Sequence, residues 1–455
     1  MPAKIVSLKY QDWSELSDQN NILSYIGDYE ENFGIHRYNE KYWTSGYVGV
    51  SRLLDNQRKT LRLNGRECVF IVSSRFGSNY WHMLEQILCD DEYEDYVSEL
   101  KKDGKFLYKI FYEQPLIPLS IDGPSNGEIL CALSFVTACF SLCHQGLKKS
   151  MSYSSGNFIG KIIGHIDIKR NMRLNTAQGR NDRFYCKHIS FTQDNVENRI
   201  LKAALKRCKK ILSSNMWDFV EIQKRLSFCS AQLEHVSDVV IKKSDFNNLS
   251  TSGLYSNYRP AIRLAQSILS QKYTSYQSDV EEMPRKSIYT IPHVINMETV
   301  FEFYVRVMLK RCIQGTEFIL DPYSSKLYLE NGQGNKPEPL SNVHLISYCI
   351  PDAIIRERNS GKVVAVIDAK YKRHEYSNRG DSLQLLAYTL LTGTNKCAFV
   401  FPDTVAALKM MRDGYFLKLS TPAFDDVVHY SELLLNTDDE DNIKTLRQFL
   451  NNAPR

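Results

Sequence analysis

Two short motifs could bind a metal ion: Pro351-Asp352 and, further along, Asp368-Ala369-Lys370. Each lies in a segment with the pattern of a strand, His344 to Glu357 and Lys362 to Tyr371. A turn at residues 358–361 joins these segments into a predicted hairpin. Because side chains alternate across a strand, Asp368 and Lys370 must share a face, and Asp352 can come opposite Asp368.

Carboxylates gathered on one buried face require a compensating charge, which a hard divalent cation supplies by accepting oxygen ligands. Mg²⁺ suits such a site because it takes few carboxylates, several waters and a substrate phosphate. The predicted metal ligands are Asp352, Asp368, the carbonyl of Ala369 and, directly or through water, Glu302. Lys370 would hold the attacking water or stabilise the transition state, so the predicted reaction is phosphodiester hydrolysis with Mg²⁺, for which Mn²⁺ could substitute. A chance hairpin with a surface salt bridge is the alternative.

Two predicted helices flank these motifs. Residues 295–309 have the apolar spacing of a helix on which Glu298 and Glu302 share a face, although such a pair could equally face solvent. Residues 381–391 form a second helix on which Gln384 and Tyr388 lie together and could contact a DNA backbone. An ordinary helix surface would look the same. Residues 396–401 then read as a buried strand of an α/β core.

The rest of the chain divides into three predicted domains. Residues 1–125 form a small mixed α+β domain with strands at 67–73 and 106–112, and residues 286–455 form the α/β domain, a mixed sheet flanked by helices. Residues 126–285 are mostly helical, with helices at 126–145, 198–212, 216–226 and 259–269, and Asp194 is the predicted N-cap of the second. Polar residues 271–286 mark the main domain boundary.

A basic stretch, residues 156–190, predicts a protruding β-hairpin, with an interdomain strand pair as the alternative. The helix at 198–212 has a lysine-rich side that could be a solvated face or a DNA-contacting one. The net charge of +5, from 57 Lys and Arg against 52 Asp and Glu, is too small for bulk charge to argue for nucleic acid.

Other features exclude several classes of protein. The 11 cysteines are scattered without a CxxC pair, so we expect a reduced cytoplasmic protein with neither disulfides nor structural zinc. The first residues lack the pattern of a signal peptide, and the apolar run 129–143 is too short to span a membrane, so a buried core helix is expected there. No Walker A motif occurs, so any nucleotide hydrolysis would belong to a partner.

The order of these motifs resembles the PD-(D/E)xK nuclease superfamily, in particular its RecB-like branch. The residues around them resemble the McrC family at Phe301-Glu302, at Ile367-Asp368-Ala369-Lys370-Tyr371-Lys372 and at Asp381-x-x-Gln384-Leu385-x-Ala387-Tyr388. A second block also resembles McrC, and consists of Gly164-x-Ile166-Asp167-x-x-Arg170, Cys186, Asp194, residues 198–205, Tyr258-Arg259 and Leu264-Ala265. The resemblance covers about residues 105–400, and the first 100 residues depart from it.

This resemblance implies a restriction-endonuclease-like fold for the C-terminal domain and a role as the nuclease subunit of a modification-dependent restriction system in antiviral defence. It implies double-stranded, modified DNA as the substrate. It also implies a hexameric McrB-like AAA+ GTPase as the partner that this chain stimulates. We expect Lys169 and Arg170, in the basic hairpin, to contact that motor.

Two other functions fit the same residues. The first is a RecB-like DNA repair or recombination nuclease, which copurification with an AAA+ GTPase would argue against. The second is a non-catalytic adaptor in which the carboxylates only order the fold and the basic helix binds DNA or protein. Cleavage lost on Asp368→Ala would argue against that.

Overall fold

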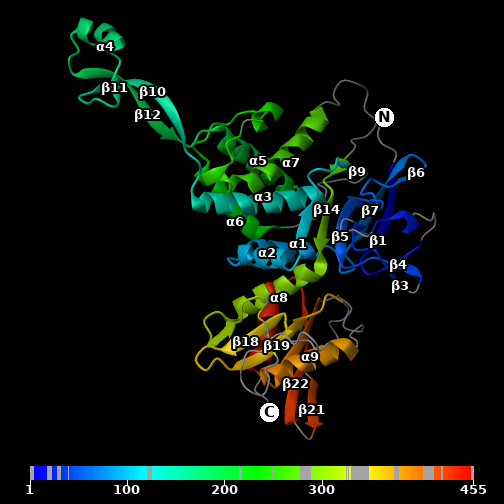
Figure 1. Ribbon diagram of the computed structural model, residues 1–455. Coiled ribbons are helices and arrows are strands. Elements are labelled where there is room, and N and C mark those ends of the chain that lie inside the picture. The colour runs from blue at the N-terminus through cyan, green and yellow to red at the C-terminus, as the bar shows by residue number, and fades with distance from the viewer. Residues whose placement is uncertain are drawn as a thin grey trace, which may run out of the picture. The chain divides into compact units, whose positions relative to one another are not determined.

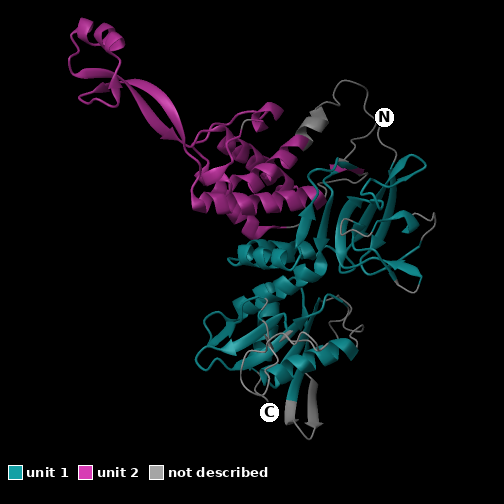
Figure 2. Ribbon diagram, in the orientation of Figure 1, with its two compact units in different colours: residues 1–117, 290–455 teal, residues 118–289 magenta. Residues whose placement is uncertain are grey.

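The computed structural model divides into two compact units (Figure 2): residues Met1–Ile117 with Thr290–Arg455, here unit 1, and Pro118–Tyr289, unit 2. It describes residues 5–17, 23–27, 32–38, 40–119, 126–214, 218–247, 249–276, 288–323, 325, 327–328, 348–372, 379–402, 415–421 and 424–451. The predicted segments 1–125 and 286–455 therefore fall largely within one compact unit, and the predicted segment 126–285 corresponds closely to the other.

The N-terminal part of unit 1 is a sheet with the order β1 (Ile5–Gln11), β7 (Arg66–Ser73), β5 (Tyr47–Arg52), β14 (His293–Asn296) and β8 (Tyr108–Ile110). The strands predicted at 67–73 and 106–112 are confirmed as β7 and β8. Only β1 and β7 are parallel in this order. A shorter sheet lies beside it, formed by β2 (Glu15–Leu16), β4 (Lys41–Trp43) and β3 (His36–Tyr38), and β6 (Arg62–Leu63) pairs with β7.

β14 enters this sheet from a segment far away in the sequence. Gly49 of β5 has a φ of 146°, and a Cβ there would lie 2.3 Å from the carbonyl oxygen of His293. A glycine is therefore required where the two strands approach each other. The residue after β14 begins α8, so the N-terminal sheet directly positions the helix that carries Glu302.

The C-terminal part of unit 1 is a mixed sheet with helices, which confirms the predicted α/β character. Its order is β15 (Phe318–Leu320), β18 (Ala353–Glu357), β19 (Val363–Ala369), β20 (Lys396–Pro402), β22 (Phe424–Leu435) and β21 (Tyr415–Thr421). The neighbours β19, β20 and β22 are parallel, and the other pairs are antiparallel. Leu385 and Tyr388 of α9 (Arg379–Thr392) pack with Val366 and Phe399 of this sheet. A short pair, β16 (Leu327–Tyr328) and β17 (Tyr348–Cys349), lies beside α9.

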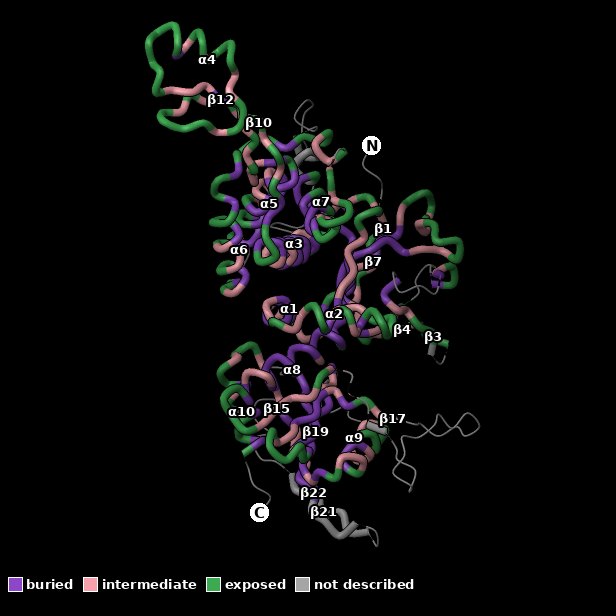
Figure 3. Tube along the Cα trace, turned by 60° about the vertical axis from the view of Figure 1, so that its left-hand side comes forward, coloured by how far each residue is buried: buried purple, intermediate pink, exposed green. Residues whose placement is uncertain are grey.

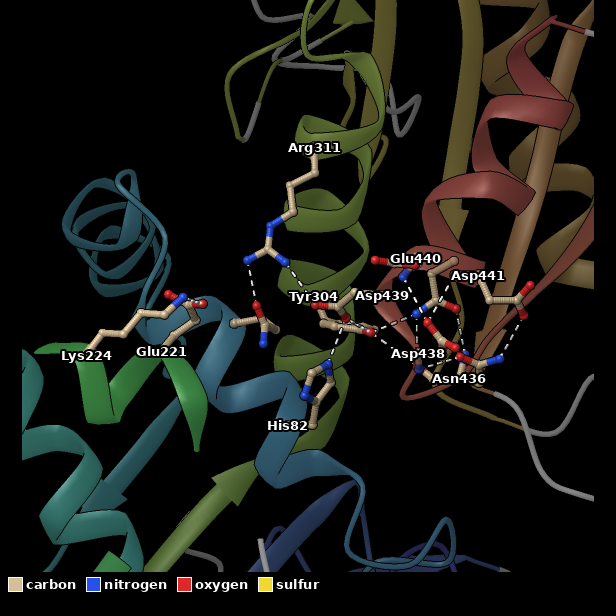
Figure 4. A network of polar contacts seen from close by, with 12 residues as sticks. His82, Glu221, Lys224, Tyr304, Arg311, Asn436, Asp438, Asp439, Glu440 and Asp441 are labelled. Carbon is tan, nitrogen blue, oxygen red and sulfur yellow. Dashed lines mark hydrogen bonds and ion pairs between the residues drawn. The ribbon is translucent and has the colours of Figure 1, made fainter. Parts of the chain in front are cut away.

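A buried helix, α8 (Met297–Ile313), joins the two parts of unit 1. It packs against α1 (Tyr80–Leu88) from the N-terminal part and α10 (Asp439–Asn451) from the C-terminal part, and α2 (Tyr93–Lys102) follows α1. Figure 4 shows the polar network between these helices. Asp439 accepts from Tyr304 at 3.0 Å and Arg311 at 2.9 Å, and lies 2.8 Å from Nε2 of His82. The Asp439 carboxylate of α10 thus contacts side chains of both α1 and α8, and these contacts join the N-terminal and C-terminal parts of unit 1.

Unit 2 is built on helices that the sequence predicted: α3 (Asn126–Gln145), α5 (Val196–Ser213), α6 (Val220–Gln232) and α7 (Tyr258–Tyr276). The predicted N-cap Asp194 is wrong, because the side chain of Asn195 accepts the capping hydrogen bond from the Asn198 N–H at 3.0 Å. Asp194 instead binds the Arg199 guanidinium. α6 begins at residue 220 instead of 216, and α7 extends to 276, into the predicted boundary segment, of which residues 277–286 lie outside the described residues.

Among the described residues, one helix is long and apolar enough to cross a membrane by length and composition, namely α3. In its apolar window, 72% of the residues are buried. Figure 3 shows α3 mostly in the colour of buried residues. This supports the prediction of a core helix.

The predicted β-hairpin is confirmed, and it projects from the helices of unit 2 (Figure 1). β10 (Ser150–Ile159) pairs antiparallel with β12 (Arg183–Thr192) along its full length, and the tip carries β11 (His165–Ile166) and α4 (Ile168–Leu174). Gly164 has a φ of 74°, and a Cβ there would lie 2.4 Å from the Lys187 carbonyl oxygen, so the tip folds back only with glycine at this position. The chain passes between the units at β9 (Ile117–Leu119) and β13 (Ile288–Thr290).

Candidate active site

The predicted catalytic hairpin forms and brings its two aspartates together. β18 pairs with β19 through Ala353 opposite Ile367, and one further step of that register places Asp352 opposite Asp368. The Ala369 N–H donates to Oδ2 of Asp352 at 2.7 Å, and the Asp352 and Asp368 carboxyl groups interact electrostatically. Residues 344–347 of the predicted first strand lie outside the described residues.

Lys370 lies on the same face as Asp368, as the strand alternation predicted. Its Nζ is 2.6 Å from Oδ2 of Asp368 and donates to Oε1 of Gln384 at 3.0 Å. The Asp381 carboxylate lies 3.7 Å from the same ammonium group. Asp368 is only 2% exposed, and its Oδ2 has the ion pair but no aligned hydrogen-bond donor. One carboxylate oxygen is thus buried without full satisfaction, as expected where a cation would bind.

Glu302 extends from α8 toward the same carboxylates, with Tyr323 and Arg306 around it. The Tyr323 hydroxyl lies near the Glu302 carboxylate, and Asp368 and Asp352 interact with this carboxylate electrostatically. Glu302, the third acidic group of the predicted site, therefore lies near the other two. Glu298, one turn earlier, is an exposed residue, and its side chain lies close to Gly46 of the N-terminal part.

These carboxyl groups hold their protons unusually strongly. Burial, followed by the charges of Asp368 and Glu302, raises the pKa of Asp352 well above its usual range, and burial also raises the pKa of Asp368. Burial raises the pKa of Glu302 to about 7. Burial alone would lower the pKa of Lys370, but the neighbouring carboxylates raise it. The site thus has more acidic groups than its lysine can neutralise, and a divalent cation would correct this imbalance.

Metal affinity is expected to rise with pH, because Mg²⁺ must displace at least one of these protons. Below pH 7 Glu302 is mainly protonated, so the apparent Mg²⁺ affinity of the chain should fall roughly tenfold per pH unit if one proton is displaced. Isothermal titration calorimetry between pH 6 and 8, in buffers of different ionisation enthalpy, measures both the affinity and the proton release. Glu302→Gln should flatten the dependence. An affinity independent of pH across this range would contradict the expectation.

Arg306 holds the main chain of Asp352, a role that the sequence analysis did not predict. It is 2% exposed, and its guanidinium donates to the backbone carbonyls of Asp352 at 2.8 Å and Asp321 at 2.7 Å. Fixing the Asp352 main chain fixes where its carboxylate points. The signal in the sequence was an arginine on the apolar side of a helix, where a charge occurs only with buried partners.

The N-terminal part of unit 1 holds the strand that carries Lys370, which no local pattern indicated. The Ser74 hydroxyl lies 2.9 Å from the Tyr371 hydroxyl, and the Arg75 guanidinium donates to the Tyr371 carbonyl. The Phe76 and Tyr371 rings pack edge to face at 5.1 Å. Asp12 accepts from the Arg75 N–H at 2.6 Å. Residues 74–76 therefore fix the backbone next to the lysine.

Gln384 and Tyr388 lie together on α9, as predicted, and both contact the segment that carries the acidic residues. Gln384 Nε2 donates to the Tyr388 hydroxyl at 2.7 Å, while its Oε1 accepts from Lys370. The Tyr388 hydroxyl donates to the Ile350 carbonyl at 3.2 Å, and the residue is 3% exposed. The exposed Gln384 is thus the member of the pair within reach of a bound strand, and their role in DNA binding stays a prediction.

Lys169 and Arg170 lie on α4 at the exposed tip of the projecting hairpin. The guanidinium of Arg170 donates to the Tyr185 hydroxyl at 2.8 Å and lies 5.4 Å from the centre of that ring. Residues 160–183 contain six Lys and Arg against two Asp. The tip is therefore basic, and Arg170 is held in a defined orientation.

Comparison with known proteins places the chain in a family. The sequence model described as "McrBC 5-methylcytosine restriction system component" matches residues 127–402, more than half of the chain. No curated protein matches. One similar solved structure is a half-complex from a tetradecameric assembly of Thermococcus gammatolerans McrB AAA+ hexamers with bound McrC, at 15% identity and a TM-score of 0.42, covering 99% of this chain and 100% of that one. Another is the Thermococcus gammatolerans McrBC complex, at 13% identity and a TM-score of 0.30, covering 68% and 88%.

The matched residues include both the hairpin of unit 2 and the acidic site of unit 1, so the chain is a component of a restriction system. It belongs to the McrBC 5-methylcytosine restriction system component family. This confirms the resemblance carried by the motifs, and it favours restriction over DNA repair.

Proposed function

We propose that this chain is the Mg²⁺-dependent DNA endonuclease subunit of its restriction system, acting in the cytoplasm on invading, modified double-stranded DNA. The observation that carries the proposal is the convergence of Asp352, Asp368 and Lys370 at adjoining strand ends. Their position on a mixed sheet flanked by helices agrees with a PD-(D/E)xK restriction-endonuclease-like domain.

The residues present fit a hard divalent cation. The buried, incompletely satisfied Oδ2 of Asp368 and the raised pKa values of Asp352 and Glu302 are the signs of carboxylates lacking a positive partner. Asp352, Asp368, the Ala369 carbonyl and Glu302 would hold Mg²⁺, or Mn²⁺ in its place. When bound, the ion would supply a Lewis acid and a water of lowered pKa.

The protein's own contribution is to place the lysine and the substrate. Asp368 and Gln384 hold the Lys370 ammonium between them, so it can donate to the attacking water or a phosphate oxygen without searching for its position. Residues 74–76 contact Tyr371, and Arg306 donates to the Asp352 carbonyl. These contacts hold the end of β19 and the start of β18 in place. Gln384 would meet the phosphate backbone from α9. The test is cleavage of methylated DNA by the complex with Asp368 intact and replaced.

We also propose that the projecting hairpin docks on a hexameric McrB-like AAA+ GTPase and stimulates it. Two surfaces of the hairpin support this. The tip is basic, and the strands expose a row of apolar side chains, formed by Met151, Tyr153, Ile189 and Phe191, the last 70% exposed. A large apolar group on a solvent-exposed strand is typical of a protein interface.

Arg170→Ala is expected to reduce stimulation of the partner's GTP hydrolysis by roughly 30-fold, the loss of about 2 kcal/mol typical of an important interface arginine. The reason is that the hydrogen bond to Tyr185 already holds the Arg170 guanidinium in one orientation, so the Arg170 side chain loses little further entropy on binding. The measurement is the rate of GTP hydrolysis by the McrB-like AAA+ GTPase as increasing amounts of the chain are added. Lys224→Ala, an exposed residue of unit 2 outside the hairpin, is the control. Equal stimulation by the Arg170 and Lys224 variants would contradict this docking.

A further inference from the structure

Three cysteines of unit 2 gather where α3 packs against α6. Cys139 and Cys143 lie on α3, one turn apart, and Cys229 lies on α6; their three sulfur atoms all lie within 4.8 Å of one another. Cys139 and Cys229 are fully buried, and Cys143 is 9% exposed. Among the residues that the structure describes, no other three side chains of the His, Cys, Asp and Glu types bring their ligand atoms this close.

The geometry suits three sulfur ligands on one ion. Residues four apart on a helix present their side chains to the same side, so α3 supplies two sulfurs in fixed positions. A zinc ion bound by thiolates at about 2.3 Å would hold the sulfurs roughly 3.8 Å apart. The observed grouping within 4.8 Å needs only a closing movement of about an ångström or less, which side-chain rotation can supply.

An arginine lies beside the three cysteines. The Arg225 guanidinium packs over the Phe140 ring at 4.4 Å and interacts electrostatically with Cys229. Its charge would offset part of the negative charge of a metal ion with three thiolates.

Other buried cysteines of this unit lack this arrangement. Cys131 lies two turns earlier on α3 and is equally buried, but it joins no group of three ligands. Cysteine in that setting behaves as a small apolar side chain. The sequence analysis expected no structural zinc and did not single out these three cysteines, because Cys229 is far from the other two along the chain.

We propose that Cys139, Cys143 and Cys229 bind one thiophilic metal ion, Zn²⁺ or Cu⁺, through their thiolates. Such an ion would join α3 to α6 close to where the hairpin begins. Tyr258 interacts electrostatically with Cys139 and Cys143, and its hydroxyl accepts from the Lys148 N–H at 2.6 Å, two residues before β10. The ion would therefore stiffen the root of the hairpin. The three thiolates are the shared chemistry, and the two ions are distinguished by elemental analysis.

The test uses the full-length chain carrying Asp368→Asn, so that the acidic site contributes little transition metal. The protein is purified under reducing conditions without chelator, and bound metal is measured by inductively coupled plasma mass spectrometry. We expect about one zinc or copper per chain, at least a tenfold loss in Cys139→Ser and in Cys229→Ser, and no loss in the matched control Cys131→Ser.

A second measurement covers variants that fail to fold. Cobalt added to the metal-depleted, folded chain with unaltered cysteines should give a sulfur-to-cobalt charge-transfer band, which a thiol-blocking reagent abolishes. Metal far below one equivalent in the purified chain together with no cobalt band would overturn the proposal and leave the three thiols as packing groups. The same loss in Cys131→Ser as in the trio variants would also overturn it.

Discussion

An Asp368→Asn chain is expected to fold normally but to lose Mg²⁺-dependent DNA cleavage by roughly 10³-fold or more, equivalent to about 4 kcal/mol of transition-state stabilisation. The substitution keeps the volume of the side chain but removes the charge that would bind the cation and pair with Lys370. No neighbour can replace it, because Asp352 is already engaged by the Ala369 N–H. Cleavage of methylated plasmid by the assembled complex measures the effect.

The matched control for this experiment is Glu357→Gln, an acid-to-amide change on the same hairpin. Glu357 lies at the far end of β18 and contacts Ser360 of the turn. It should cleave as the unaltered chain does. Calorimetric titration with Ca²⁺, which binds without supporting turnover in the expected mechanism, separates lost metal binding from lost chemistry. Cleavage retained by Asp368→Asn would contradict the site assignment, because Asp368 is the carboxylate that both pairs with Lys370 and would bind the ion.

The hairpin of β18 and β19 could be predicted because every relationship in it is local. Strand alternation fixes that Asp368 and Lys370 share a face, and a short turn fixes that the strand of Asp352 lies alongside. Helical spacing similarly brought Gln384 and Tyr388 together. In each case the period of the strand or helix, 2 or 3.6 residues, determines which side chains share a face, whatever the rest of the fold is.

The groups that hold the hairpin could not be predicted, because they come from distant parts of the chain. Ser74 and Arg75 meet Tyr371 only because β14 leaves the second half of the sequence and completes the N-terminal sheet. No period or spacing encodes such a crossing. The prediction of the α5 N-cap was wrong for a different reason. Asp194 and Asn195 are both residue types that cap helices well. Asp194 instead binds Arg199 and Ser237, and only the fold brings Ser237 next to it.

Lys148→Met is expected to destabilise unit 2 by about 3–5 kcal/mol, because it leaves the Glu197 carboxylate buried without its cation. Nζ of Lys148 lies 2.6 Å from Glu197 Oε1 and donates to the Ser250 carbonyl at 3.0 Å, and the two side chains are only 10% and 7% exposed. Hydrogen exchange of the α3 and α5 amides in the full-length chain, followed by mass spectrometry, measures the loss where it occurs.

The control is Lys224→Met, which breaks an exposed ion pair with Glu221 whose side chains are 67% and 42% exposed and should cost less than about 1 kcal/mol. Adding Glu197→Gln to Lys148→Met should recover most of the loss, because a neutral amide can keep the Ser250 N–H bond without a buried charge. If the Lys148 and Lys224 variants exchange alike, the buried pair is not what orders this region. Lys148 lies two residues before β10, at the base of the hairpin. A loosened base would hold Arg170 at the tip less firmly, so stimulation of the AAA+ GTPase should fall in Lys148→Met. It should return in the Lys148→Met, Glu197→Gln double variant.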